Sequence, residues 1–147
     1  MKFYKWNECH VPIVEKFRDM FNEEDYSSLI IWEIEGDDVH YKDKPLSCSL
    51  GQQNKIIVDI KVCQDHNLTE DECIACIAHE IGHIFDPTQN DEAHHEEREL
   101  NADKKVIELG LQEHLISALK KLCADDTPEQ KLLTDKRIKA LEECFNR

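Results

Sequence analysis

A capped amphipathic helix, predicted over residues 70–85, constrains the fold of this chain more than any other sequence feature. The stretch Thr69-Glu70-Asp71-Glu72 is a capping box, in which the Thr69 side chain accepts a hydrogen bond from the backbone N–H of Glu72. Leu68, just before it, is placed to pack against Cys73 as a hydrophobic staple. A helix with so defined a start fixes which side chains share each of its faces.

The two sides of this helix differ in character when its residues are placed at about 100° per position. Side chains that can bind metal or carry protons fall on one side, which is formed by Cys76, His79, Glu80 and His83. The opposite side is apolar and is formed by Ile74, Ile77, Ala78, Ile81, Ile84 and Phe85. We therefore expect the helix to bury its apolar side and to present a chemically active polar side.

The polar side carries His79-Glu80-Ile81-Gly82-His83, which is an H-E-x-x-H pattern. Residues four apart lie on one face of a helix, so His79 and His83 can both bind one metal ion. In this pattern the two histidines bind Zn²⁺, and the glutamate, here Glu80, acts as general base on a zinc-activated water. Gly82 allows close packing. A tetrahedral site that keeps one position open for water needs a third protein ligand.

The best candidate for the third ligand is Glu99, in Glu99-Leu100-Asn101-Ala102-Asp103 on the next predicted helix. Asp103 lies one turn later on the same face, where it can accept a hydrogen bond from the free ring nitrogen of a ligating histidine. Ala102 has a small side chain that lets the two helices approach each other. Three neighbouring acids remain alternative ligands: Glu92, Glu96 and Glu97.

Taken together, these motifs resemble those of the gluzincin zinc metallopeptidases, in particular the M48 (Ste24/HtpX-like) group, which carries H-E-x-x-H followed by E-x-x-x-D. The resemblance covers roughly residues 71–110. It implies a zincin-like fold in which His79, His83 and Glu99 bind zinc, Glu80 is the general base, and a peptide or protein substrate is hydrolysed. Membrane members of that group have transmembrane helices, so this chain resembles a soluble minimal catalytic domain.

A second group, the ImmA/IrrE-like regulatory peptidases, has a similar small site. Its glutamate helix typically ends in Ala-Asn, where this chain has Ala102-Asp103. This group is the neighbouring alternative, and the choice between the two groups leaves the substrate open.

Two further roles are suggested by the resemblance to zincins. The substrate of a zincin usually lies antiparallel to an edge strand just before the zinc helix, and residues 54–60 are the candidate strand. An ordinary sheet strand is the alternative interpretation of this segment. A donor for the developing oxyanion is also expected, and His95, one turn before Glu99, is the first candidate. The alternative is a solvated helix histidine. Weaker candidates for the donor are His94, Tyr41 and His114.

The whole chain, residues 1–147, predicts one domain of α+β class. A helix is expected over residues 11–21, followed by short strands within residues 28–34, 39–41, 46–50 and 55–60. These strands are expected to form a small, mostly antiparallel sheet packed on the H-E-x-x-H helix. Capping and termination signals predict later helices over residues 91–109, 111–123 and 127–145. A leucine stripe on the second of these predicts core contact by Leu111, Leu115, Leu119 and Leu122.

Charge and composition indicate which binding partners and which cellular location to expect for this protein. Eighteen basic against 32 acidic residues give a formal charge of −14, which disfavours contact with nucleic acid or anionic membrane. An apolar run long enough to span a membrane and a secretory leader are both absent from the sequence, so we expect a soluble, unexported protein. The seven cysteines are odd in number, and free thiols in a reducing cytoplasm fit better than a disulfide framework. The pair Cys73 and Cys76 is more typical of packing inside a helix than of a redox or zinc-knuckle site.

Two functional interpretations follow from this sequence. The first is an active zinc metallopeptidase, and the second is a non-catalytic regulatory or interaction module in which zinc only ties helices together. A structural zinc site is closed by four protein ligands, and Cys76 or His95 would then fill the fourth position. The sequence does not indicate the oligomeric state.

Overall fold

The computed structural model describes residues 2–4, 10–21, 30–34, 47–50, 55–86 and 95–145. Its strands are β1 (Lys2–Tyr4), β2 (Ile30–Ile34), β3 (Ser47–Leu50) and β4 (Lys55–Asp59). Its helices are α1 (Val11–Met20), α2 (Ile60–Asp65), α3 (Glu70–Phe85), α4 (His95–Glu108), α5 (Gln112–Leu122) and α6 (Pro128–Phe145). A short 3₁₀ helix, η4 (Cys123–Asp125), lies between α5 and α6.

The four strands form one sheet in the order β1-β2-β4-β3. β1 pairs with β2, and β2 with β4, in parallel, whereas β3 and β4 are antiparallel. The predicted fold class, α+β with a mostly antiparallel zincin-like sheet, is therefore wrong. The prediction missed β1, and it did not recognise α1 as a crossover. A helix between two neighbouring strands carries the chain back to the end where the first strand began, so the second strand runs parallel to it.

The predicted substrate strand, residues 54–60, is also corrected by this topology. β4 has paired neighbours on both sides, β2 and β3, so its backbone hydrogen bonds are used within the sheet. Among the strands that the structure describes, β1 and β3 lie at the two edges of the sheet. The strand expected at residues 39–41 lies outside the described residues.

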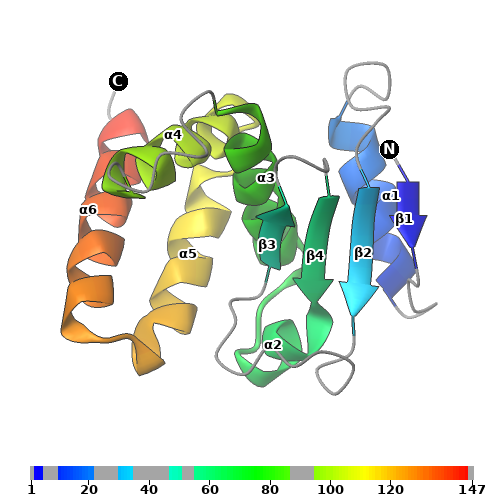
Figure 1. The fold of residues 1–147 in the computed structure, drawn as a ribbon, viewed down its shortest axis with the longest axis horizontal. Helices are drawn as coiled ribbons and strands as arrows, with labels where there is room; N and C mark the ends of the chain where they lie inside the picture. Colours follow the sequence, from blue (N-terminus) through cyan, green and yellow to red (C-terminus); the bar gives the residue numbers. More distant parts are fainter. Residues whose placement is uncertain are drawn as a thin grey trace.

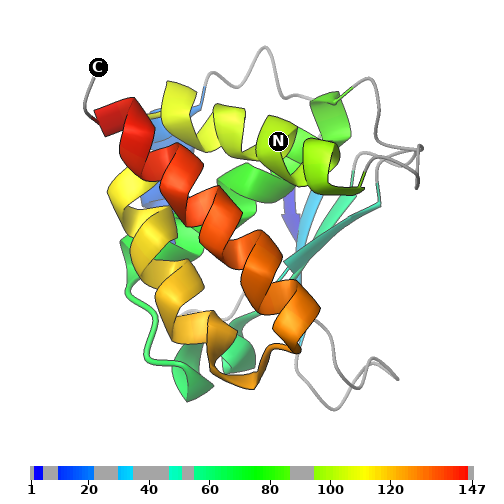
Figure 2. The same ribbon diagram turned by 90° about the vertical axis from the view of Figure 1, so that its left-hand side faces the viewer.

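Helix α3 lies at the centre of the molecule. Figure 1 shows α1 and α3 behind the sheet, with α4, α5 and α6 on the side of α3 away from β1 and β2. Figure 2 shows these last three helices as an outer layer in front of α3. The core between the layers is made of fully buried side chains from α1, the sheet, α3 and α5, among them Phe17, Ile31, Ile56, Ile74, Ile77, Ile81 and Leu115.

Because α3 is covered on most sides, its two faces differ less in burial than expected. Its residues Cys76 and His79 are also buried, at 7% and 6% exposed, although most of its apolar side chains are completely buried. Phe85, which was expected on the apolar side, is 55% exposed at the end of the helix. Neighbouring elements therefore bury part of the polar side of α3 in addition to its apolar side.

The capping and termination motifs predicted at the helix ends are confirmed. The Thr69 hydroxyl accepts from the backbone N–H of Glu72 at 3.2 Å, and α3 begins and ends where predicted. Thr127 and Gln130 form a reciprocal capping box at the start of α6. After α4, Gly110 has φ of 73°, and the N–H of the next residue, Leu111, donates to the Val106 carbonyl at 3.0 Å. These motifs depend only on residues within one or two turns.

The outer helices match their predicted ranges closely. Helix α5 buries the predicted leucine stripe, since Leu111, Leu115 and Leu119 are buried and Leu122 packs against the core. Helix α4 is described from His95, so the predicted start at residues 91–94 lies outside the described part. Helix α2 was not predicted. Within the described ranges, no helix combines the length and the apolar composition needed to cross a bilayer.

Candidate metal centre

Helices α3 and α4 cross at Gly82 and Ala102 with almost no space between them. A Cβ atom placed on Gly82 would lie 2.7 Å from the Ala102 Cα atom and still closer to its carbonyl oxygen. No side chain fits at such distances, so only glycine at position 82 permits this crossing. The approach brings His79 and His83 on α3 within reach of Glu99 on α4.

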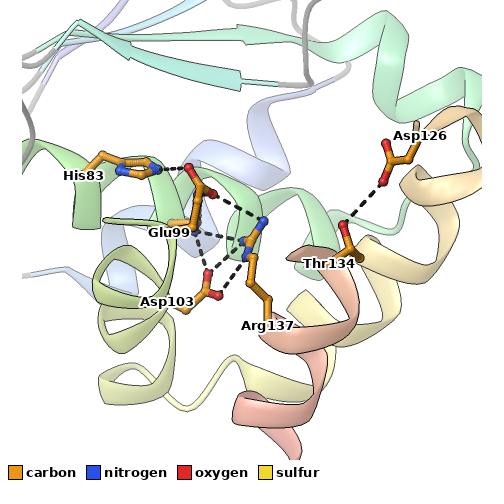
Figure 3. A network of polar contacts seen from close by, with 7 residues as sticks. His83, Glu99, Asp103, Asp126, Thr134 and Arg137 are labelled. Carbon is orange, nitrogen blue, oxygen red and sulfur yellow. Dashed lines mark hydrogen bonds and ion pairs between the residues drawn. The ribbon is translucent and has the colours of Figure 1, made fainter. Parts of the chain in front are cut away.

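These three residues converge on one point. The Nε2 atom of His79 lies 3.2 Å from Glu99 Oε2, and the Nε2 atom of His83 lies 3.0 Å from Glu99 Oε1. The two imidazole rings stand edge to face with centroids 4.6 Å apart. Figure 3 shows His83 and Glu99 pointing toward each other from neighbouring helices. Both histidines thus present the same ring nitrogen to a single carboxylate.

The donor set fits a zinc ion. Zn–N and Zn–O bonds of about 2.0–2.2 Å in a tetrahedral arrangement place neighbouring ligand atoms about 3.3 Å apart. The two His–Glu99 distances are close to this value, and one ligand atom from each residue lies within 4.8 Å of the others. Among the described residues this is the only such group of three or more His, Cys, Asp or Glu side chains. A ring-nitrogen pair with one carboxylate is also a donor set that zinc accepts readily.

Asp103 forms a hydrogen bond with one of these histidines, His79. His79 Nδ1 lies 2.7 Å from Asp103 Oδ1, and the carboxylate is almost completely buried. A proton on Nδ1 that donates to Asp103 leaves the Nε2 lone pair for a metal ion. Burial and the charge of Arg137 lower the pKa of His79, but hydrogen bonds to Asp103 and Glu99 outweigh them and raise it to about 9. An ion at Nε2 therefore displaces a proton when it binds.

Arg137, which α6 brings into the same cluster, was not predicted from the sequence. Its guanidinium donates to both oxygens of Asp103, through Nε to Oδ2 at 2.9 Å and through Nη2 to Oδ1 at 2.8 Å. Its Nη1 atom also lies 3.4 Å from Glu99 Oε2. Figure 3 shows Arg137 between Asp103 and Glu99. Burial raises the pKa of Asp103, but hydrogen bonds from Arg137 and His79 outweigh it, so the pKa is lowered overall.

A signal for Arg137 is present in the sequence of α6. Thr134 and Leu141 are buried and Ile138 packs against the core, so these residues mark the inner face of the helix. Arg137 falls on that face, three residues after Thr134 and four before Leu141. A charged residue inside a buried stripe points to a buried partner, and here the partner is a carboxylate on another helix.

Glu80 follows His79 on α3 and is partly buried. Burial raises the pKa of its carboxyl group, and the neighbouring His79 and His83 lower it less than burial raises it. Its side chain does not belong to the group of converging ligand atoms. The general-base role of Glu80 stays a prediction.

Other predicted candidates do not join the cluster. His95 is exposed on the first turn of α4, and His114 is partly buried on α5. Neither belongs to the group of converging ligand atoms. His94 and Tyr41 lie outside the described residues. The oxyanion donor thus stays a prediction without a contact to support it.

The described alternative ligands also lie outside the group of converging ligand atoms. Glu96 is exposed and pairs with Lys136 at 3.2 Å, and Glu97 is exposed as well. Glu92 lies outside the described residues. Cys76 is buried on α3, with a pKa raised mainly by that burial, and it is absent from the ligand group. Of the described acids on α4, Glu99 is the one that faces both histidines.

The close crossing of α3 and α4 gives a first prediction, based on two glycine substitutions. Gly82→Ala forces the helices apart, and overpacking of this kind typically lowers the free energy of unfolding by about 1–3 kcal/mol. Because the histidines move away from Glu99, we also expect weaker zinc binding. Chemical denaturation and a zinc titration with a competing chelator measure the two effects.

Gly110→Ala is the matched control. A methyl group there meets no atom within 4 Å, but φ of 73° strains any residue with a Cβ, at a cost of about 1–2 kcal/mol. We expect lower stability with unchanged zinc affinity. Wild-type zinc affinity in folded Gly82→Ala would show that the helix crossing does not set the metal site.

Comparison with models of known protein families, with curated proteins and with solved structures gives no match for this chain. The resemblance of its motifs to those of the M48 and ImmA/IrrE-like peptidases therefore stays a prediction.

Proposed function

We propose that this chain is a zinc-dependent metallopeptidase that hydrolyses peptide bonds in a peptide or protein substrate. The observation that carries the proposal is the convergence of His79, His83 and Glu99, with Glu80 directly beside them on α3. Three protein ligands rather than four, among the described residues, is the arrangement typical of catalytic zinc sites. Neither Cys76 nor His95 supplies a fourth ligand atom there.

Each residue has a defined task in this proposal. Bound zinc would polarise the peptide carbonyl group and make a water molecule more acidic. Glu80 takes a proton from that water and delivers it to the leaving amine nitrogen as the C–N bond breaks. His79, His83 and Glu99 hold the ion, and Asp103 fixes the tautomer of His79. Water attacks directly, so no covalent intermediate with the chain is formed.

The presence of cysteines that form no disulfide supports a reducing compartment for such an enzyme. Among the described residues, Cys73 and Cys76 are buried free thiols, and Cys123 and Cys144 are free and partly buried. Free thiols of this number are typical of a reducing compartment such as the cytoplasm.

Metal removal tests the proposed function. We expect the purified protein to contain one zinc per chain by mass spectrometry and to cleave members of a fluorogenic peptide library. A chelator should abolish cleavage, and added Zn²⁺ should restore it, because the ion is part of the reacting centre. A protein that holds one zinc and gains thermal stability from it, but cleaves no peptide, would support the non-catalytic zinc module instead.

A further inference from the structure

Arg137 connects the last helix to both sides of the candidate metal centre. From α6 it contacts Asp103 and Glu99 on α4, and its Nη2 atom lies 3.2 Å from His79 Nδ1 on α3. The side chain of Arg137 is 11% exposed and that of Asp103 is 3% exposed. One guanidinium therefore lies against both Glu99 and His79, and it also bonds the Asp103 carboxylate that accepts from His79.

The pairing with Asp103 fixes the plane of that carboxylate. Nε binds one oxygen and Nη2 binds the other, which is the bidentate geometry that arginine forms and lysine does not. Oδ1 then lies where it also accepts from His79 Nδ1 at 2.7 Å. Rotation of the carboxylate would break two bonds at once, so the position of the acceptor for His79 is set from α6.

The donor pattern explains why both Asp103 and Arg137 are needed. Arginine has only donors, so a hydrogen bond from Nη2 to Nδ1 would place the imidazole proton on Nε2 and block that atom as a ligand. Asp103 Oδ1, 2.7 Å from Nδ1 and 2.8 Å from Nη2, accepts from both groups and keeps the proton on Nδ1. Arg137 in turn offsets the negative charge of the buried Asp103 and the partly buried Glu99.

Arg137 also contacts Glu99, the candidate third zinc ligand. Arg137 Nη1 is 3.4 Å from Glu99 Oε2, which is the oxygen that faces His79 Nε2. One turn before Arg137 on α6, the Thr134 hydroxyl donates to Asp126 Oδ2 at 3.4 Å and helps to fix the start of the helix (Figure 3). This bond fixes the α6 backbone one turn before Arg137, and the guanidinium itself contacts both carboxylates of α4.

We propose that Arg137 is a positioning residue of the metal centre, which sets zinc affinity by orienting Asp103 behind His79 and by holding Glu99 in place. The proposal rests on the zinc site of the proposed function, but it does not require that the site cleaves peptides. It makes the docking of α6 a condition for tight metal binding.

The test compares zinc affinity in Arg137→Lys and Arg137→Met with that of the wild type, by titration against a chromophoric chelator. Loss of groups that orient metal ligands typically weakens metal binding about 10–100-fold. We expect Arg137→Met to lie in this range. Arg137→Lys keeps the charge but not the bidentate geometry, so an intermediate loss is expected. The visible spectrum of Co²⁺-loaded protein should change as well, because it reports ligand geometry.

Lys136→Met is the matched control for these substitutions. Lys136 precedes Arg137 on α6 and also pairs with an acid of α4, Glu96, but both partners are about half exposed. This variant removes one positive charge and one contact between the same two helices without touching the cluster. We expect its zinc affinity to stay within about twofold of the wild-type value, since exposed ion pairs contribute little.

Circular dichroism recorded during the titration yields a dissociation constant even for a variant that folds only with zinc. Wild-type affinity and Co²⁺ spectra in both Arg137 variants would overturn the proposal and leave Arg137 a structural residue. A zinc-binding wild type that never cleaves peptides would count against the proposed function alone. The two proposals therefore fail separately.

Discussion

Glu80→Gln is expected to keep its zinc and to lose peptide hydrolysis by about 10²–10⁴-fold, the range typical for removal of a general acid–base group. Glutamine has nearly the same shape as glutamate, so α3 and the three converging ligands should be unchanged. Its amide cannot take a proton from water at neutral pH or deliver one to the leaving amine. The measurement is kcat/KM on a cleaved library peptide, together with zinc content by mass spectrometry.

The control for this substitution is Glu70→Gln on the same helix. Glu70 lies in the first turn of α3, where it pairs with Lys16 at 3.0 Å and is almost half exposed. We expect wild-type activity and zinc content. Activity retained in zinc-loaded Glu80→Gln would exclude Glu80 as the general base, and the peptidase proposal would then lack its proton carrier.

Glu99→Ala is expected to release the metal. The substitution removes the carboxylate that faces both histidines and leaves two protein ligands for the ion. We expect the zinc dissociation constant to rise by more than the factor of about 10–100 that is typical for residues behind the ligands. Peptide hydrolysis should fall to background at substoichiometric zinc. Competition with a chromophoric chelator measures the affinity.

Glu96→Ala and Glu97→Ala are the matched controls for Glu99→Ala. Both acids belong to the first turn of α4 and are exposed, and both were alternative ligands on sequence grounds. We expect each to bind zinc as the wild type does. Zinc binding that survives Glu99→Ala but not one of these substitutions would reassign the third ligand to that acid.

The candidate metal site was predicted from the sequence more fully than the fold. Residues His79 and His83 share a helix face because of their spacing, and Glu99 and Asp103 share another for the same reason. The structure brings the two faces together, with the Gly82–Ala102 crossing at the point where the small residues lie. The predicted bond between Asp103 and a histidine is present, and it involves His79.

The sheet was predicted less well because strand pairing is not a local property. Ile56 on β4 pairs with both Ile31 on β2 and Ser49 on β3. A run of β-type residues predicts that a strand exists, but not which strand lies beside it or in which direction. The short β1 and the crossover through α1 decided the parallel pairing of the first two strands.

By itself, the sequence determined the features that depend on residues within one or two helical turns. These are the cap at Thr69, the turn at Gly110, the bounds of α3, and the pairing of His79 with His83 on one face. Such features need only backbone geometry and short hydrogen bonds, which the spacing of residue types fixes. The tertiary structure alone decided the strand order and the place of Arg137, which is 34 residues from Asp103 and 58 from His79. Contacts over such separations are set by how whole helices and strands pack, because burying an arginine is tolerated only where another element supplies a carboxylate.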